Sequence, residues 1–216
     1  MRPHPPALDR QETLRYLGAG GTVDPALQAL LDRAEQELLQ QSVIRAAARQ
    51  LPLNQLEPLL QGQDIEAHLK GCTRGLLLAV TLGAGLDAAL RRALAVEPVY
   101  GVVLDAAASA YVEQAAQEWE QELRSQVAGQ GLYMTGRFSP GYGDWPLTVQ
   151  PSFLQWMDAS RQAGLSTSES CMLVPGKSVT ALCGIADHPV QGQLAGCAHC
   201  ALRETCTKRK EGNPCV

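Results

Sequence analysis

The sequence predicts an α+β domain built around a mainly antiparallel sheet, and three observations lead to this expectation. Apolar residues recur at helical spacing in several stretches, as amphipathic helices require. Short apolar runs bounded by glycine or proline lie between those stretches, and such runs are typical of buried strands. Helices and strands are mixed without the strict alternation of a parallel βαβ sheet, so antiparallel pairing is favoured.

The first expected elements are two helices followed by a strand. Residues 8–17 predict a short helix that ends at a glycine cluster. A second helix is expected over 25–39, because the Asp-Pro pair at its start combines a good N-cap with the residue preferred at the first helical position. Residues 42–60 are ambiguous, with two short apolar segments that fit a strand and its exit. The glycine-bounded apolar run 75–82 predicts a buried strand.

Two further helices are expected in the middle of the chain. Leucine and alanine over 86–94 indicate a short helix. The longest helix is expected over 98–127, where apolar residues approximate one face and small residues fill the centre. Glycines end this helix. Residues 133–135 then lead into a loop that starts at Arg137.

The last third of the chain is expected to hold one helix and two strands. The helix covers 151–162, with apolar residues near its middle. Strands are expected over 172–174 and 179–185, on either side of a Pro-Gly turn. This arrangement predicts a hairpin with Lys177 at its tip.

Composition limits the classes of function. The 216 residues fit one domain over 1–190, whose N-terminal helical part is about 8–60, followed by a cysteine-rich tail over 191–216. The net charge is −4 and no basic block occurs, so a nucleic-acid partner is not expected. No apolar run approaches ~20 residues and no signal peptide is visible, so we expect a cytoplasmic protein with no membrane partner.

Four cysteines of the tail are spaced as ligands of one metal site. Cys197, Cys200, Cys206 and Cys215 form a Cys-x2-Cys-x5-Cys-x8-Cys pattern, which can converge four thiolates on zinc or on a [4Fe–4S] cluster. Disulfides or free thiols are the alternative. The remaining three cysteines lie in apolar settings and are expected to be small core residues: Cys72, Cys171 and Cys183.

The loop that begins at Arg137 carries the clearest functional chemistry. Arg137 offers a planar fork of donors that fits a carboxylate. Pro140 restricts the unbound loop, and Gly141 permits a close approach to the backbone. Tyr142 adds a phenol and Asp144 a carboxylate. This set suits a small zwitterion such as an amino acid or its nucleoside conjugate; the alternative is a surface turn with a solvated arginine.

The flanking motifs resemble a known family. They are the Arg-x-x-Pro-Gly-Tyr turn, the Pro-Gly-x-Ser-Val strand entry about thirty residues later, the N-terminal Leu-Arg-Tyr-Leu-Gly and the middle Leu-Leu-Leu-Ala-Val-Thr-Leu-Gly. Together they resemble the activation (reactivation) domain of cobalamin-dependent methionine synthase, in its short stand-alone form. The resemblance covers roughly residues 8–186.

The resemblance implies a site for S-adenosylmethionine. The matching positions are Arg137 for the methionyl carboxylate, together with Ser139, Gly141 and Tyr142. The family also uses an acidic residue on the preceding long helix, and ungapped matching places that position on Ser109. Two acidic residues lie one turn away on that helix and are the candidate replacements: Asp105 and Glu113.

Each acidic candidate of the site has an ordinary structural alternative. Glu113 is either a ligand contact or a solvated surface charge. Asp144 either pairs with the ammonium of the ligand or caps a turn. Glu169 and Lys177 flank expected strands and are expected to be solvated, although Lys177 is also placed to face a partner.

The resemblance further implies an activation subunit that is not active alone. S-adenosylmethionine and an external electron would restore methylcobalamin after the cobalt of a partner has oxidised, so the expected partners are a corrinoid protein and an electron donor. The chain has no Asp-x-His-x-x-Gly cobalamin signature, so the partner would hold the cobalamin. The alternatives are an activator of another corrinoid methyltransferase with an iron–sulfur tail, and a non-enzymatic metal-binding adaptor.

Overall fold

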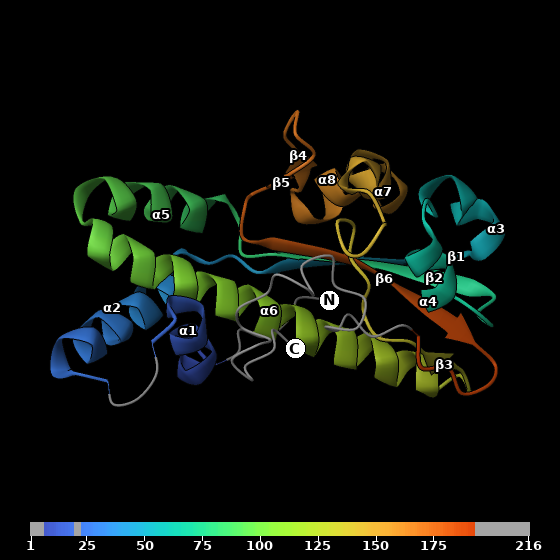
Figure 1. The fold of residues 1–216 in the computed structure, drawn as a ribbon, viewed down its shortest axis with the longest axis horizontal. Helices are drawn as coiled ribbons and strands as arrows, with labels where there is room; N and C mark the ends of the chain where they lie inside the picture. The colour runs from blue at the N-terminus through green and yellow to red at the C-terminus, as the bar shows by residue number, and fades with distance from the viewer. Residues whose placement is uncertain (1–6, 20–22, 193–216) are drawn as a thin grey trace. The chain divides into compact units, whose positions relative to one another are not determined.

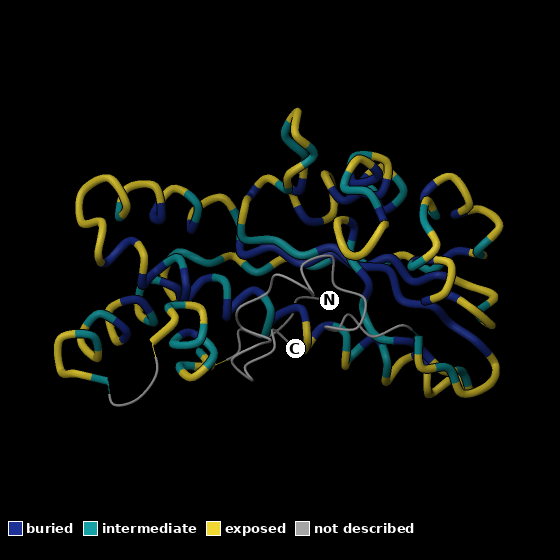
Figure 2. The backbone as a smooth tube through the Cα atoms, in the orientation of Figure 1, coloured by how far each residue is buried: buried dark blue, intermediate teal, exposed yellow. Residues whose placement is uncertain are grey.

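The computed structural model describes residues 7–19 and 23–192, and it confirms the α+β class with an antiparallel sheet (Figure 1). The main sheet has the strand order β1-β2-β6-β3, formed by Arg45–Pro52, Arg74–Thr81, Ser178–Ala186 and Tyr133–Met134. β3 pairs antiparallel with β6, with Met134 opposite Ile185. β2 and β6 are buried along nearly their whole length, as Figure 2 shows in dark blue.

The chain divides into two compact units. The first unit consists of the described residues within Met1–Ala47, Ala79–Glu122 and Asp158–Val179, and the second of those within Ala48–Leu78, Leu123–Met157 and Thr180–Val216. The boundaries fall inside several strands and inside the long helix α6, Pro98–Ala128. The expected body over 1–190 and cysteine-rich tail over 191–216 stay a prediction beside this division.

The first unit is held together by a helical core. α1 (Arg10–Leu17), α2 (Pro25–Gln41), α5 (Ala84–Val96) and the beginning of α6 contribute to it. Leucine, valine, alanine and tyrosine side chains form one buried cluster: Leu31, Ala34, Leu38, Leu82, Leu86, Leu90, Tyr100, Val103, Leu104, Ala107, Ala108, Tyr111 and Val112. The alanines of α6 permit close packing of the helices, which explains the small residues at its centre.

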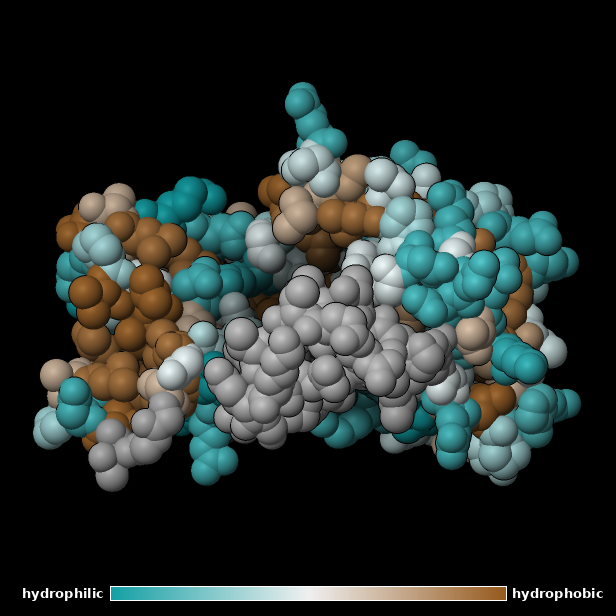
Figure 3. Space-filling view, in the orientation of Figure 1, coloured by the Kyte–Doolittle hydropathy of each residue, from teal (hydrophilic) through white to brown (hydrophobic). Residues whose placement is uncertain are grey.

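A two-stranded hairpin in the first unit corrects one expectation. β5 (Leu173–Val174) pairs with β4 (Ser166–Thr167), not with β6. The Pro175–Gly176 segment therefore joins two different sheets. The tip of the hairpin contains Cys171 at φ 62, and Figure 3 shows this tip as hydrophilic. Cys171 is accordingly half-buried and is not the core residue that its sequence setting predicts.

The second unit contains several short helices around an aromatic core. They are α3 (Leu53–Leu56), the 3-10 turn η1 (Glu57–Leu59), α4 (Gln63–His68), the 3-10 turn η2 (Leu147–Val149) and α7 (Gln150–Met157). Trp145 and Phe153 are fully buried, with ring centroids 6.1 Å apart at a near edge-on angle. This pair anchors the segment that follows the Arg137 loop.

Most expected helices and strands are present, with two differences besides the hairpin. The strand within the ambiguous stretch 42–60 is β1, but the short helices α3 and α4 that follow it have no clear sequence signal. The helix expected over 151–162 is broken at Asp158, whose φ of 51 ends α7 and precedes α8 (Ala159–Ala163). Among the scattered cysteines, Cys183 is buried as expected, whereas Cys72 is half-buried, and burial raises the pKa of its thiol.

Two expectations concern segments or properties beyond these elements. The tail cysteines Cys197, Cys200, Cys206 and Cys215 lie outside the described residues. Within the described ranges, no group of three or more histidine, cysteine or acidic side chains is arranged to hold a metal ion. None of the described helices is long and apolar enough to cross a membrane.

Candidate functional site

The loop from Arg137 to Pro146 lies in the second unit and is tied directly to β6. Phe138 and Leu182 exchange two backbone hydrogen bonds, of 3.0 and 2.8 Å between nitrogen and oxygen. Just before the loop, the backbone N–H of Thr135 donates to the carbonyl oxygen of Gly184 at 2.9 Å. The sheet therefore fixes the backbone on both sides of Arg137.

Side chains from two helices fix the entry to the loop. The guanidinium of Arg124, in α6, donates to the carbonyl oxygens of Met134 and Thr135. The hydroxyl of Thr135 lies 2.9 Å from Nε2 of the buried His68, in α4. That same nitrogen lies 3.1 Å from the carbonyl oxygen of Gly136. These contacts hold the chain rigid one residue before Arg137.

The turn itself is closed by backbone hydrogen bonds. The N–H of Tyr142 donates to the carbonyl oxygen of Ser139 at 3.1 Å, and the N–H of Gly141 donates to that of Trp145 at 2.8 Å. Gly141 has φ 94, a conformation that side chains with a Cβ rarely adopt. A Cβ built there would contact only a methyl group of Leu147, at 3.6 Å, so the backbone of this glycine is open to an approaching molecule.

An aromatic base supports the turn. The ring of Phe138, 4% exposed, lies 5.1 Å from the ring of His68, 6.3 Å from that of Tyr142 and 6.1 Å from that of Trp145, measured between centroids. The indole N–H of Trp145 donates to the carbonyl oxygen of Leu59 at 2.7 Å. Tyr142 remains 52% exposed, so its ring lies at the surface, next to the buried rings of the aromatic base.

Asp144 is engaged with the backbone of α4. Its carboxylate accepts hydrogen bonds from the N–H groups of Gln63 and Asp64, at 2.7 and 3.0 Å. These are orphan donors at a helix N-terminus, which a carboxylate satisfies well. The geometry therefore matches the turn-capping alternative for Asp144, and its pairing with a ligand ammonium stays a prediction.

The acidic candidates on α6 lie in the first unit and differ in their surroundings. The carboxylate of Asp105 lies 2.9 Å from the ammonium of Lys177, which also donates to the hydroxyl of Ser109 at 2.8 Å. Asp105 and Ser109 are thus joined to the strand entry by one cation. Lys177 therefore engages Asp105 within the first unit, and the role of Glu113 as the helix carboxylate of the ligand site stays a prediction.

The Arg137 loop presents a compact set of groups for a ligand. Arg137 and Ser139 are half-buried, Pro140 is buried, and Gly141 and Tyr142 are exposed. A half-buried guanidinium interacts more strongly with a carboxylate than a fully solvated one, because less water screens the pair. The loop is therefore suited to bind a small molecule that carries a carboxylate and a cationic or apolar group next to it.

Several residues that shape the site carry no signal in the sequence. His68, Asp64 and Arg124 contact the loop or its entry, yet His68 and Asp64 lie more than sixty residues before their partners. A single histidine or aspartate on a short helix is most simply read as a surface or core residue. Only the folded chain shows that they support the loop.

Comparison with known proteins identifies the fold. No family model matches the chain, and no curated protein matches it. Among solved structures, the chain is similar to the MetH reactivation domain in its crystal structure bound to AdoHcy, with a TM-score of 0.62 and 15% sequence identity. The match covers 95% of this chain and 82% of that one. The chain therefore has the fold of a methionine synthase reactivation domain, as its sequence motifs predict.

Proposed function

From this fold, we propose that the chain is a stand-alone activation subunit of a cobalamin-dependent methionine synthase. It binds S-adenosylmethionine at the Arg137 loop and supports reductive remethylation of a cobalamin that a separate protein holds. The observation that carries the proposal is the Arg-x-x-Pro-Gly-Tyr turn, built on a buried aromatic base and tied to β6. The likeness to a reactivation domain crystallised with AdoHcy supports the same ligand class.

The groups of the loop fit the methionyl end of such a ligand. Arg137 is placed to fork onto the carboxylate. The open backbone of Gly141 accommodates close contact, and the exposed ring of Tyr142 attracts the positively charged sulfonium. Ser139 contributes a half-buried hydroxyl beside the turn. The aromatic base pre-orders these groups, which lowers the entropic cost of binding.

The contribution of the chain is positioning. Bound S-adenosylmethionine supplies an already activated methyl group, and the acceptor is the cobalt of the partner after a one-electron reduction from an external donor. The loop needs to hold the methionyl part in one orientation so that the methyl group faces the partner. No general base is required for this transfer, and we assign none. Glu113 is our candidate for the carboxylate that the family carries on the long helix.

Calorimetric titration with S-adenosylmethionine tests the ligand. We expect the wild-type chain to bind S-adenosylmethionine. In Arg137→Ala the binding free energy should be less favourable by about 1.5–3 kcal/mol, because a charged, bidentate contact disappears. Arg74→Ala is the matched control, since Arg74 is an exposed arginine of the same unit whose side chain makes no hydrogen bond or ion pair in the described part of the chain. Equal affinity in Arg137→Ala and the wild type would remove the loop from the ligand site.

Pull-down with purified corrinoid protein tests the partner. We expect the isolated cytoplasmic chain to carry no cobalamin after purification and to bind the corrinoid protein preferentially in its Co(II) form. Stoichiometric, tightly held cobalamin in the isolated chain would contradict this part of the proposal. Titration should be repeated with the corrinoid protein present, because the partner is expected to complete the surroundings of the methyl group.

The spacing of the tail cysteines supports a second candidate function. In it, the chain activates a different corrinoid methyltransferase and its tail carries an iron–sulfur cluster. A visible absorption band that is lost on reduction would favour this candidate. A non-enzymatic adaptor with a metal-binding tail is favoured instead if the chain fails to bind S-adenosylmethionine both alone and with its partner.

A further inference from the structure

A separate cavity lies entirely within the first unit. It has a volume of about 250 Å³ and is lined by residues from β1, the start of α5, the end of α8 and the strand entry. These residues are Val43, Arg45, Gly83, Ala84, Gly85, Ala163, Gly164 and Pro175. The volume lies just below the range of about 300–1,000 Å³ that is typical for drug-sized ligands, so the cavity suits a smaller guest.

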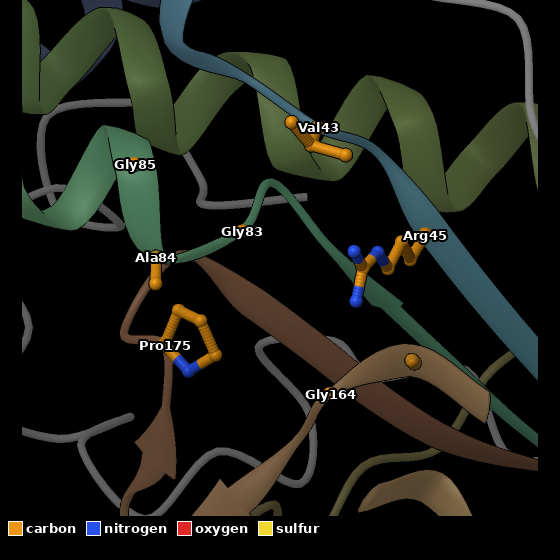
Figure 4. Close-up of a pocket in the computed structure, with 8 residues that line it drawn as sticks. Val43, Arg45, Gly83, Ala84, Gly85, Gly164 and Pro175 are labelled. Atoms are coloured by element: carbon orange, nitrogen blue, oxygen red, sulfur yellow. The ribbon is translucent and has the colours of Figure 1, made fainter. Parts of the chain in front are cut away.

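Arg45 is the one charged residue that lines this cavity, and it is exposed to solvent at the start of β1. Figure 4 shows its guanidinium reaching from β1 into the space between Gly83, Gly164 and Pro175. In the described part of the chain, no hydrogen bond or ion pair joins the side chain of Arg45 to another residue. Arg49, two positions along the same strand, instead donates to the carbonyl oxygen of Trp156 at 2.6 Å. Arg49 thus supports the structure through a backbone hydrogen bond, whereas the guanidinium donors of Arg45 face the cavity.

Glycines keep the space in front of Arg45 open. A Cβ on Gly164, whose φ is 71, would come within 3.3 Å of a terminal nitrogen of Arg45. A Cβ on Gly85 would come within 2.9 Å of the carbonyl oxygen of Gln41. A side chain at Gly164 would therefore crowd the guanidinium, whereas one at Gly85 would clash with the backbone of Gln41. α5 also begins at this wall, so the positive end of its dipole adds to the charge of Arg45.

The rest of the lining determines the kind of anion. Val43, Ala84, Ala163 and Pro175 supply apolar walls. The acidic side chain in the first turn of α5, Asp87, accepts a hydrogen bond from the N–H of Gly176 at 2.6 Å and is thereby engaged with the backbone. A guanidinium facing apolar walls matches a carboxylate attached to a short hydrocarbon, because the fork binds both oxygens while the walls cover the aliphatic part.

We propose that this cavity is a second ligand site, which binds a small aliphatic carboxylate through Arg45. The site is independent of the proposed function, because none of its lining residues belongs to the Arg137 loop. The proposal predicts that the chain binds a short organic acid as well as S-adenosylmethionine.

Ligand-observed NMR and calorimetry on the full chain test this site with three probes. Isovalerate is the carboxylate probe, isovaleramide is its uncharged counterpart of nearly the same shape, and inorganic phosphate is an anion without an apolar part. We expect isovalerate to bind at least about tenfold more tightly than either of the others, which corresponds to one charge-assisted contact of about 1.4 kcal/mol. Equal binding of isovalerate and isovaleramide, or binding of phosphate alone, would overturn the proposal.

Two variants and one control connect the binding to the cavity. Arg45→Gln should weaken isovalerate binding about tenfold or more, and Ala84→Leu should block the cavity from its exposed rim. Arg91→Gln removes the same charge from an exposed position of α5 and should change nothing. All variants should keep the wild-type melting temperature and affinity for S-adenosylmethionine. Undiminished isovalerate binding in Arg45→Gln would refute the site without touching the Arg137 assignment.

Discussion

Asp64 and Asp144 cap each other. The carboxylate of Asp144 accepts the backbone N–H groups of Gln63 and Asp64, and the carboxylate of Asp64 accepts the backbone N–H of Asp144 at 3.1 Å. This exchange joins the N-terminus of α4 to the end of the turn that carries Tyr142. A close approach accompanies it, since a Cβ on Gly143 would meet an oxygen of Asp64 at 2.1 Å. The turn is therefore braced from outside by a short helix.

The first prediction separates the capping role of Asp144 from ligand binding. Asp144→Ala should lower the free energy of unfolding by about 1 kcal/mol, because two helix N–H groups lose their acceptor. Asp144→Asn should lose less, since its amide oxygen still accepts one of them. Urea denaturation measures both changes. If Asp144 only caps the helix, the affinity for S-adenosylmethionine should stay within about twofold, a change much smaller than the loss of one charged contact.

The reciprocal geometry supplies a control for this prediction. Asp64→Ala removes the other half of the exchange, and the double variant should be less destabilised than the sum of the two single ones, because both act on one network. If Asp144→Asn weakens ligand binding as much as Arg137→Ala does, the carboxylate contacts the ligand ammonium and the capping account of its role is incomplete.

The second prediction concerns the backbone of the turn. Gly141→Ala should destabilise the protein by about 1–2 kcal/mol, because alanine resists a positive φ, and it should also weaken S-adenosylmethionine binding. Gly129→Ala is the matched control, since a Cβ there meets neighbouring carbonyl oxygens only at an ordinary 3.5 Å. Thermal melting and calorimetry measure the two effects. A Gly141→Ala protein with wild-type stability and affinity would show that the turn does not need this conformation.

Local signals in the sequence predict helices whose capping side chain lies directly before the helix. Asp24 followed by Pro25 marks the start of α2, and its carboxylate accepts the N–H of Leu27 at 2.7 Å. The N-terminus of α4 has Gly62 at its cap position and no capping side chain of its own. Its acceptor, Asp144, lies 80 residues further along the chain. No local pattern can reveal such a cap, and α4 was accordingly not predicted.

The distinction between local signals and contacts with distant residues also explains why the hairpin prediction was wrong and why the Arg137 loop was predicted. A Pro-Gly pair indicates a turn but not which strands pair, so β5 and β6 were expected to pair with each other although each pairs with another strand. The composition of the Arg137 loop identified its chemistry, because arginine, glycine and tyrosine there act through their own side chains and backbone. The base of the loop depends on distant residues such as His68, and these became visible only in the fold.

The third prediction concerns Lys177, which joins the strand entry to α6 in the first unit. Its side chain is 16% exposed and reaches the carboxylate of Asp105, whose side chain is 49% exposed. Lys177→Met should lower the free energy of unfolding by about 1–2 kcal/mol, between the values for exposed and buried pairs. Lys70→Met, at an exposed position, is the control and should be nearly neutral. A double-mutant cycle with Asp105→Ala, followed by urea denaturation, measures the coupling; no coupling would contradict the pairing.

The last prediction concerns the tail, whose four cysteines lie outside the described residues. If Cys197, Cys200, Cys206 and Cys215 hold one metal site, metal binding and the order of the tail are coupled, because four thiolates must converge on one centre. Replacing any one of them by serine should release the metal while S-adenosylmethionine binding by the Arg137 loop persists.

Cys72→Ser is the control, since that half-buried thiol is not part of the four-cysteine pattern and should not affect the metal content. Metal analysis of protein purified without oxygen distinguishes the outcomes: iron with sulfide and a brown colour indicate a cluster, whereas about one zinc per colourless chain indicates a structural site. Four freely titratable thiols and no metal would exclude both the cluster and the zinc site. They would also exclude a role of the tail in electron transfer.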